Sequence, residues 1–519
     1  MTGERPPWSL WLGVAVVSGL RALPYLSAIH DPVTESGVLP PIGYNPKDWV
    51  TYVAFMREAA ANGQLLQVNP FTTMQQDGRY LLLLQDALGF LCRWTGASPF
   101  TVLELSRIPL LALMLLAFWR VTGVVLAERR ERVLACWLLL CSGGLEVLLD
   151  LAAGGIPPQI RDTVQQDLWH LQGWNTFAAS YNPLWLAGLA LTFVTVVPLL
   201  RPRGPSGWRD VATLAVGIPI LSWTHPYSAI VIVAVAAARP VLAWVLGADA
   251  PFAGIAGILG RLVPALAVLG AVSHWQRADA VYAITSNYAF GPQTLPVFWY
   301  PVTLGAVGFF AVRGWRRWIV EGCPAWVGVA AWTITVVLLH TSPVLGGYHF
   351  VSHLHPPLCL AAASALLPLR DRLRGRPLAL AALAVLLFQT PLTLTWKCLR
   401  EVQDQRIPRS TMRAIDALAP LPPGNVLSPD DVGLYVPAYT PHRVYVGHWF
   451  LTPAEPRKAA EAAAALSGLR GPQLVQLVDA ERIRYVVAPA ISAPLVGLAL
   501  EGRVGQTLPA GQLTVLVLN

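Results

Sequence analysis

The chain has 519 residues, of which 55% are hydrophobic and 13% are charged, and its mean hydropathy is +0.51. A soluble domain carries about 25% charged residues, so the composition excludes an ordinary soluble protein and indicates a polytopic membrane protein. The net charge of +8 is attributed to basic cytoplasmic loops. No basic patch with interleaved aromatic residues indicates nucleic-acid binding, and the six cysteines show no metal-ligand spacing.

Apolar runs of about 20 residues predict eleven membrane-spanning helices. The first, at about 9–28, has no clear cleavage site and is interpreted as a retained helix. The others are expected at about 100–126, 133–152, 178–200, 211–223, 226–246, 256–273, 294–312, 323–340, 355–369 and 377–396. Residues 80–98, interrupted by Asp86 and Arg93, predict an interfacial or re-entrant helix.

Clusters of arginine orient these helices. With the N-terminus inside, the four clusters all fall on the cytoplasmic side, at residues 129–132, 201–209, 313–317 and 370–376. The polar loops 153–177, 273–293 and 341–354 contain only Arg161 and Arg277 as basic lysine or arginine residues, and fall outside. If residues 80–98 crossed the membrane, every cluster would lie on the wrong side, so the positive-inside rule favours the interfacial interpretation.

The pattern changes from about residue 400 onward. Short apolar-alternating runs predict strands at 425–428, 433–437, 443–447, 484–488 and 513–518, with helices at 454–467 and 472–480. We therefore expect an all-α membrane domain over 1–399, with a first external loop at 29–99, and a small α/β domain over 400–519. The odd number of spans places this domain outside, and its expected surface residues include Tyr439, His442, His448 and Thr452.

The first external loop carries the leading candidates for chemistry. Asp31 follows the first helix, and Asp48 and Tyr52 lie four residues apart on a short helix predicted to end at Asn62-Gly63. Asp48 falls at the start of that helix, where the positive end of the helix dipole favours a carboxylate. A capping role is therefore the alternative to a catalytic one.

The other external loops supply candidates for substrate binding. The second loop contains Asp162 and Asp167, and the third contains Arg277. His225 lies between two apolar runs and before a proline, where it could contact a phosphate or hydrogen-bond a freed carbonyl.

Three histidines occur within seven residues at an outer membrane boundary. His349 and His353 are four residues apart and could share a helix face. This cluster could bind phosphate or a metal, and aromatic anchoring at the interface is the alternative.

These features together resemble the GT-C superfamily of membrane glycosyltransferases. The features are a first helix followed by a large external loop, the acidic stretch Asp48-Trp49-Val50-Thr51-Tyr52, the run from Asn62 to Thr72, polar external loops, and an external α/β domain. The arrangement of helices and loops resembles the superfamily over most of the chain. The specific sequence motif is limited to one short stretch.

The resemblance implies transfer of a hexose or pentose from a polyprenyl-phosphate donor to an acceptor glycan, lipid or protein. Transfer would occur on the external face by an inverting displacement. Asp48 matches the acidic position of the superfamily best and Asp31 second, as the group that deprotonates or orients the acceptor. Arg277, His225 and His349 are the implied candidates for compensating the charge of the leaving phosphate.

One acid stands in the stretch Lys47-Asp48-Trp49, where many members of the superfamily have a pair. This departure leaves a dependence on a divalent metal open, and also leaves open a member without activity. Richness in alanine, arginine and proline indicates a bacterial genome, hence a protein of the inner membrane.

Two other classes of function stay open. A transporter or lipid flippase would place charged groups near the membrane midplane and show matching halves, which the sequence lacks. A non-catalytic assembly factor for cell-envelope glycans would use residues 400–519 to bind a partner.

Overall fold

The computed structural model describes residues 4–30, 46–145, 176–201, 207–246, 251–286, 300–323, 325–342, 347–401 and 406–519. The chain divides into two compact units. The first consists of Met1–Pro24, Leu105–Ala271 and Ala289–Arg400. The second consists of Tyr25–Glu104, Val272–Tyr288 and Glu401–Asn519, so residues of the first loop group with the C-terminal segment.

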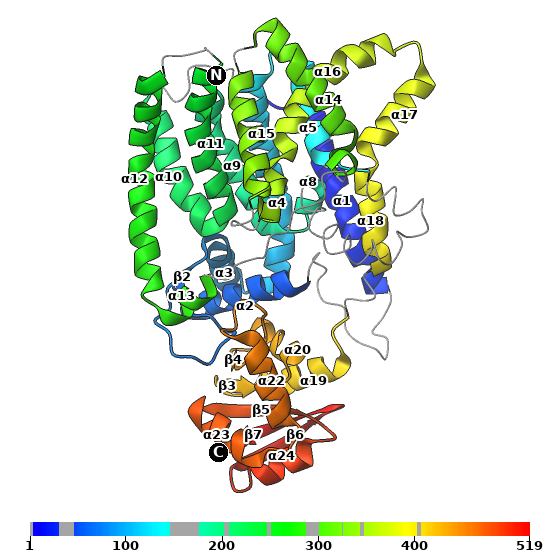
Figure 1. Ribbon diagram of the computed structural model, residues 1–519. Coiled ribbons are helices and arrows are strands. Elements are labelled where there is room, and N and C mark those ends of the chain that lie inside the picture. Colours follow the sequence, from blue (N-terminus) through cyan, green and yellow to red (C-terminus); the bar gives the residue numbers. More distant parts are fainter. Residues whose placement is uncertain are drawn as a thin grey trace. The chain divides into compact units, whose positions relative to one another are not determined.

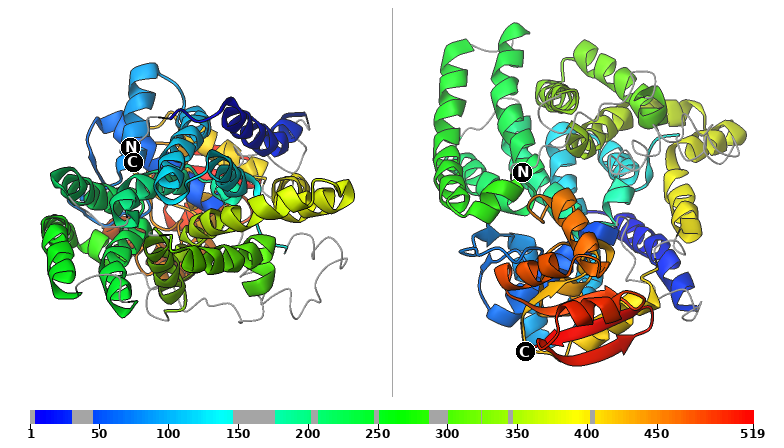
Figure 2. Two further views of the ribbon diagram at one scale, coloured as in Figure 1. Left: turned by 90° about the horizontal axis from the view of Figure 1, so that it is seen from above. Right: turned by 60° about the horizontal axis from the view of Figure 1, so that its bottom comes forward.

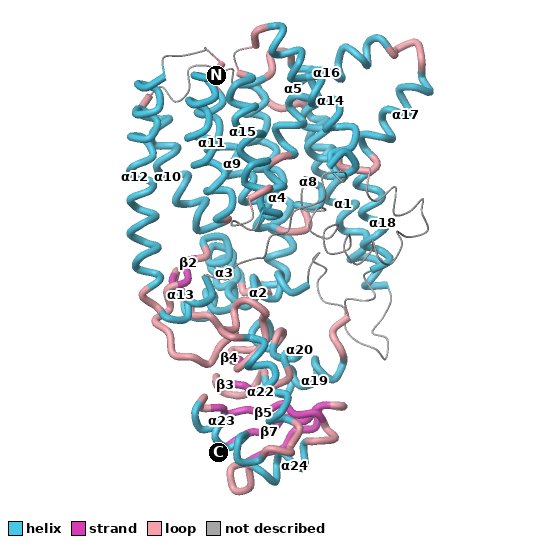
Figure 3. The backbone as a smooth tube through the Cα atoms, in the orientation of Figure 1, coloured by secondary structure: helices cyan, strands magenta, loops and turns pink. Residues whose placement is uncertain are grey.

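The first unit is built from helices in its described parts (Figures 1 and 3). They are α1 (Trp8–His30), α4 (Pro99–Val125), α5 (Arg129–Cys141), α8 (Thr176–Ala179), α9 (Pro183–Leu200), α10 (Trp208–Thr224), α11 (Pro226–Val245), α12 (Pro251–Arg277), α14 (Tyr300–Glu321), α15 (Trp326–His340), the 3-10 helix η3 (Gly347–His353), α16 (His355–Arg372), α17 (Pro377–Phe388) and α18 (Thr390–Glu401). The last residues of α1, α12 and α18 and the first residues of α4 are assigned to the second unit.

Four helical segments in the described ranges have the length and apolar composition of a membrane span. They are Pro99–Val125, Pro183–Leu200, Pro226–Val245 and His349–Arg372. A fifth results if α17 and α18, which meet at an angle of 49°, form one broken span. The predicted total of eleven spans stays a prediction.

Several predicted helix ends shift in the structure. In the region of the helix predicted at 133–152, α5 begins at Arg129 and ends at Cys141, and Gly143 and Gly144 follow. Residues 146–152 of that prediction lie outside the described residues. The helix predicted at 178–200 begins at Pro183, since Asn182 Oδ1 accepts a 3.0 Å hydrogen bond from the Leu184 amide. The prediction that Arg313–Arg317 follow a helix is wrong, because α14 continues to Glu321.

One arginine of α14, Arg317, has a partner on another helix of the first unit. Arg317 Nη1 lies 3.2 Å from a carboxylate oxygen of the buried Glu131 on α5, and Arg317 Nε lies 2.8 Å from Glu321. One turn earlier, a Cβ on Gly314 would lie 1.8 Å from the carbonyl oxygen of Ala361 on α16. Helices α14 and α16 therefore pack at backbone contact distance.

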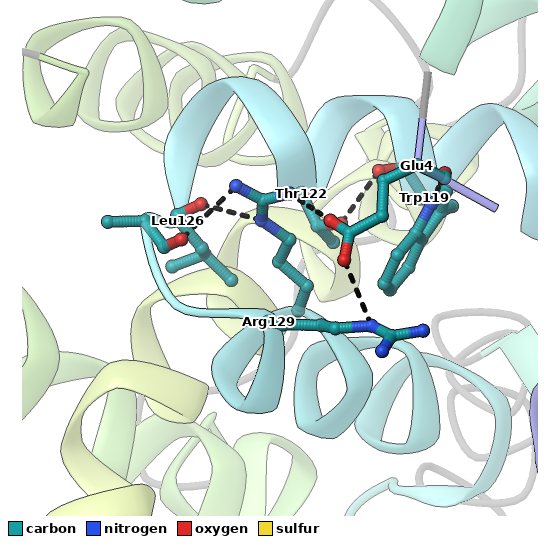
Figure 4. A network of polar contacts seen from close by, with 7 residues as sticks. Glu4, Trp119, Thr122, Leu126 and Arg129 are labelled. Carbon is teal, nitrogen blue, oxygen red and sulfur yellow. Dashed lines mark hydrogen bonds and ion pairs between the residues drawn. The ribbon is translucent and has the colours of Figure 1, made fainter. Parts of the chain in front are cut away.

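A second polar network ties the N-terminal residues to the junction between α4 and α5 (Figure 4). Glu4 lies 3.1 Å from Arg129 Nε and 3.1 Å from Arg132 Nη1, and its carbonyl accepts a 3.0 Å hydrogen bond from Trp119 Nε1. Arg132 Nε also donates to the carbonyl of Leu126 at 2.9 Å. The basic run after α4 is thus neutralised in part by the N-terminal segment.

The second unit holds all the strands of the described ranges (Figure 3). Strands β1 (Leu66–Gln67) and β2 (Tyr80–Leu81) form an antiparallel pair beside α2 (Pro46–Asn62) and α3 (Leu83–Thr95). A five-stranded sheet has the order β4-β3-β5-β7-β6. Figure 2 shows its C-terminal strands in red. Its strands are β3 (Asn425–Leu427), β4 (Arg443–Val444), β5 (Ile483–Pro489), β6 (Val504–Ala510) and β7 (Leu513–Leu518), of which β3, β4 and β5 are mutually parallel.

Alternation along the central strand β5 divides the core of this unit in two. Tyr485 and Val487 face a cluster that contains Phe55 and Phe71 of the first loop. Val486 and Ala488 face the opposite cluster, which is formed with α22 (Glu455–Leu466), α23 (Gly471–Ala480) and α24 (Ala493–Ala499). Residues of the first loop therefore cover one face of the sheet, together with α19 (Arg409–Leu418), and the three helices cover the other.

Four of the five strands predicted after residue 400, and both predicted helices, are found in the structure. One predicted strand is absent, and one observed strand was not predicted. Residues 433–437 span the end of the short helix α20 (Asp430–Gly433), a turn and the start of the short helix α21 (Val436–Tyr439). Pro437 lacks the amide that a strand ladder needs. Strand β6 was not expected, because it is largely exposed and contains Gly505 and Pro509, which weaken a strand pattern.

Three residues expected at the surface are buried. His442, His448 and Thr452 are each at most 2% exposed. His442 Nδ1 accepts from the Gly424 amide at 3.2 Å and its Nε2 donates to the Leu418 carbonyl at 2.8 Å. These polar side chains are buried because they satisfy main-chain groups inside the unit.

Candidate functional site

Helix α2 carries the candidate base. It begins at Pro46, holds Asp48 in its first turn and ends at Asn62, followed by Gly63 with φ of +65°. This confirms the predicted helix and its end, because a positive φ favours glycine. Residues Trp49, Val50, Val53 and Met56 are at most 3% exposed, whereas Asp48 and Tyr52 are half-buried. The two polar side chains therefore border the buried face.

Aromatic side chains fix the start of α2. The Trp49 ring lies 5.5 Å from Phe100 and 6.5 Å from Tyr435. Phe100 in turn lies 4.8 Å from Tyr439, and Tyr52 packs against the same cluster. Since Tyr435 and Tyr439 belong to the C-terminal segment, that segment helps to position Asp48.

Main-chain and side-chain hydrogen bonds join the run Asn69-Pro70-Phe71 to the C-terminal segment. The Val444 amide donates to the Pro70 carbonyl at 3.0 Å, and Thr452 Oγ1 donates to the Phe71 carbonyl at 2.8 Å. The Phe71 ring lies 5.3 Å from the buried His448 ring. The run Asn69-Pro70-Phe71, which is part of the sequence resemblance, therefore attaches the first loop to the C-terminal segment.

The third polar loop is attached to the same unit. The buried carboxylate of Asp279 accepts from the Asp77 amide at 2.6 Å and from the Tyr282 amide at 2.9 Å. Arg79 Nη1 donates to the Trp275 carbonyl at 2.5 Å. Arg277 lies in the last turn of α12, between Trp275 and Asp279 in the chain, and its side chain is exposed. The unit that contains Asp48 therefore also has an exposed cation.

Asp86 is a buried carboxylate that the sequence did not single out as functional. Its two oxygens accept from the Leu82 amide at 3.1 Å and from Gln67 Nε2 at 3.2 Å. Burial raises the pKa of Asp86 to about 7, against the opposing effect of these hydrogen bonds. It fixes the first turn of α3 against β1, and its signal in the sequence is the carboxylate that interrupts the apolar run 80–98.

A second polar cluster lies in the first unit, at the junction of α10 and α11. His225 Nδ1 is 2.8 Å from Ser228 Oγ, which is 2.7 Å from His353 Nε2. The rings of His225 and His353 are stacked with centroids 6.0 Å apart. The structure thus brings His225 to the histidine-rich segment, as neither sequence pattern alone indicated.

The expectation that His349 and His353 share a helix face is wrong. The segment is a 3-10 helix with three residues per turn, so residues four apart point in different directions. His349 stacks on Tyr227 with centroids 4.0 Å apart and an interplanar angle of 16°, whereas His353 bonds to Ser228.

The remaining predicted site residues are Asp31, Asp162 and Asp167, which lie outside the described residues. Asp48, Tyr52 and Arg277 belong to the second unit, and His225 and His349 belong to the first. Within the described ranges, no group of three or more His, Cys, Asp or Glu side chains is arranged to hold a metal ion.

No protein-family model matches the chain, and no curated protein matches its sequence. Solved structures do match. The chain is similar to ArnT from Cupriavidus metallidurans with a TM-score of 0.56 and 11% identity, covering 97% of both chains. It is similar to the Archaeoglobus fulgidus oligosaccharyltransferase with a TM-score of 0.51 and 13% identity, covering 98% of this chain and 74% of that one.

A third similar structure is the mycobacterial arabinofuranosyltransferase AftD, with a TM-score of 0.53 and 17% identity. The match covers 99% of this chain and 42% of AftD. All three proteins are GT-C glycosyltransferases, and the alignments run along nearly the whole of this chain. The fold that the sequence resemblance implied is therefore confirmed: this chain has the GT-C fold.

Proposed function

We propose that this chain is an integral membrane glycosyltransferase that takes a sugar from a polyprenyl-phosphate donor. One observation carries the proposal: the fold matches ArnT over 97% of both chains, and an ArnT structure is bound to undecaprenyl phosphate. The similar oligosaccharyltransferase is tethered with an acceptor peptide. The acceptor here is a glycan, lipid or protein on the extracytoplasmic face of a bacterial inner membrane.

Asp48 is the proposed base. Its place in the first turn of α2 favours the ionised carboxylate, and its half-buried position leaves part of the side chain accessible. In the proposed step, Asp48 takes the proton of an acceptor hydroxyl while that oxygen attacks the anomeric carbon of the sugar. The bond from the anomeric carbon to the phosphate oxygen breaks, polyprenyl phosphate leaves, and the configuration inverts. Asp31 is the second candidate for the base.

The departing phosphate needs positive charge close by. Arg277 is the proposed cation, since its guanidinium is exposed at the end of α12, in the compact unit that contains Asp48. Tyr52, one helical turn from Asp48, is proposed to bind substrate, as are His349, Asp162 and Asp167.

Binding of undecaprenyl phosphate to the purified full-length protein tests this proposal. We expect saturable binding that weakens on the order of tenfold in Arg277→Ala, the loss of about 1.4 kcal/mol. The matched control is Arg470→Ala, which removes another exposed arginine of the same unit. Absence of saturable binding to undecaprenyl phosphate and to its hexosyl and pentosyl esters would reject the transferase and favour a transporter or an assembly factor.

A further inference from the structure

The three parallel strands of the second unit form a topological switch point. The connection from β3 to β4 runs through α20 and α21, whose Val432 and Val436 belong to the cluster with Phe71 on one face of the sheet. The connection from β4 to β5 runs through α22 and α23, which cover the opposite face. Since β4 and β5 lie on either side of β3, the two connections diverge at the carboxyl ends of β3 and β5. In open α/β sheets, ligands bind in the crevice at such a point.

A groove of about 480 Å³ lies at this switch point. Its lining includes Pro429, which follows the end of β3, and Pro489 and Ile491, which lie at and beyond the end of β5. Leu466 and Ser467 come from the end of α22, which is labelled with β3 and β5 in Figure 1. Small-molecule sites in proteins occupy about 300–1,000 Å³, so the groove is large enough for a ligand.

The polar side chains of the groove present hydrogen-bond acceptors. Ser492 Oγ donates its hydrogen to the Pro489 carbonyl at 3.2 Å, and Ser467 Oγ donates to the Ala464 carbonyl at 2.7 Å. Each hydroxyl oxygen therefore faces a ligand as an acceptor. The exposed carboxylate of Asp430 adds two more acceptor oxygens. This set favours a ligand that brings hydrogen-bond donors, and the negative charge of the carboxylate disfavours phosphate and other anions.

Aliphatic side chains form the rest of the lining. Ala459 and Ala463 lie one turn apart on α22, and Ile491 is 92% exposed. The turn after α22 is held in place by Gly468, because its φ is +75° and a Cβ there would lie 2.5 Å from the Cβ of Leu495 on α24. Fixed acceptors beside apolar side chains suit a sugar ring, which has C–H groups on its faces and hydroxyl donors around its edge.

We infer that this groove binds a neutral or amine-bearing sugar. Asp430 accepts hydrogen bonds from the hydroxyl or amino groups of the sugar, and Ile491 contacts a C–H face of the ring. The inference goes beyond the proposed function, because the described lining of the groove contains neither Asp48 nor Arg277, and a site built from acceptors does not suit a phosphate-linked donor. The C-terminal segment then has a sugar-binding role of its own.

Binding of simple sugars to the purified full-length protein tests the inference. The probes are the methyl glycosides of glucose, galactose, mannose and arabinose, with glucosamine and glucuronate as the cationic and anionic counterparts of glucose. We expect saturable binding of at least one methyl glycoside, and binding of glucuronate on the order of tenfold weaker than binding of glucosamine. Absence of saturable binding by every methyl glycoside, or equal binding of glucosamine and glucuronate, overturns the inference.

Variants place the bound sugar in the groove. Ala463→Arg fills the groove with a long side chain whose own donors compete for the acceptors, and should weaken binding at least on the order of tenfold. The matched control is Ala460→Arg, at an exposed alanine of the same helix outside the lining, which should bind as the wild type does. Asp430→Asn, which removes the charge and keeps the shape, should abolish the preference for glucosamine over glucuronate. Unchanged binding in Ala463→Arg overturns the inference.

A competition measurement separates this inference from the proposed function. Sugar binding should persist in Arg277→Ala and in the presence of undecaprenyl phosphate, because the groove does not take the phosphate. The groove is therefore confirmed or rejected whether or not undecaprenyl phosphate binds elsewhere. Displacement of the sugar by undecaprenyl phosphate would place the sugar at the donor site instead, and would overturn the inference.

Discussion

Asn69 Nδ2 donates a 2.7 Å hydrogen bond to the carbonyl of Leu451, 382 residues further along the chain. The same side chain accepts from the Phe71 amide at 2.9 Å, so one amide group both shapes the first loop and fastens it to the C-terminal segment. The Val444 amide and Thr452 Oγ1 add two more hydrogen bonds to the same run. The helix that carries Asp48 and the five-stranded sheet therefore belong to one folded unit.

Asn69→Ala should destabilise this unit by about 1–3 kcal/mol, because it leaves the buried Leu451 carbonyl without its donor. Hydrogen exchange at the Phe71 and Val444 amides measures the loss, since both amides are bonded within the docked run. Asn62→Ala is the matched control, because Asn62 bonds only to the side chain of Glu58 at the surface. Equal exchange in the two variants would show that this contact contributes nothing.

Asp86 should make the stability of the second unit depend on pH. Its pKa in the folded protein is raised to about 7, so the favourable contribution of the protonated form is complete below the unfolded pKa, near 4. That contribution is lost as the pH rises through about 7. We expect Asp86→Asn to remove this part of the pH dependence, measured as melting temperature between pH 4 and pH 8. Asp430→Asn, at an exposed carboxylate, is the control. An unchanged pH profile in Asp86→Asn would contradict the raised pKa.

Asp48→Asn should lower the rate of sugar transfer by a factor of about 10²–10⁴ while donor binding is retained, because it removes the proton acceptor and keeps the side-chain shape. Transfer from labelled undecaprenyl-phosphate sugars measures the rate. Glu58→Gln, on the same helix, should transfer at the wild-type rate, since Glu58 bonds only to Asn62. Wild-type transfer in Asp48→Asn would reduce Asp48 to the cap of α2.

Gly314→Ala should lower the melting temperature of the first unit, because the added Cβ would lie 1.8 Å from the Ala361 carbonyl oxygen and force α14 away from α16. Overpacking of this kind costs about 1–3 kcal/mol or more. Gly270→Ala on α12 is the control: nothing lies within 4 Å of its added Cβ, so the change should be neutral or slightly stabilising. Equal melting temperatures would show that the two helices separate without cost.

Local patterns predicted the elements that one segment determines by itself. Helix α2, its end at Asn62-Gly63 and the break between α10 and α11 at His225 were found where apolar periodicity, glycine and proline placed them. Pattern failed at 433–437, where alternating apolar residues form short helices, and at His349 and His353, which adopt a 3-10 helix. In both segments the local sequence is compatible with more than one backbone conformation. The packing of each segment against its neighbours determines which conformation it adopts.

The sequence by itself determined the membrane class, the polar first loop with Asp48, and the α/β character of the C-terminal segment, because composition and periodicity report burial along a single segment. Only the tertiary structure decided that Asn69 binds Leu451, that Asp86 is enclosed, and that Ser228 stands between two histidines. These relationships join residues far apart in the chain. Their geometry depends on which surfaces pack together, and no local pattern contains that information.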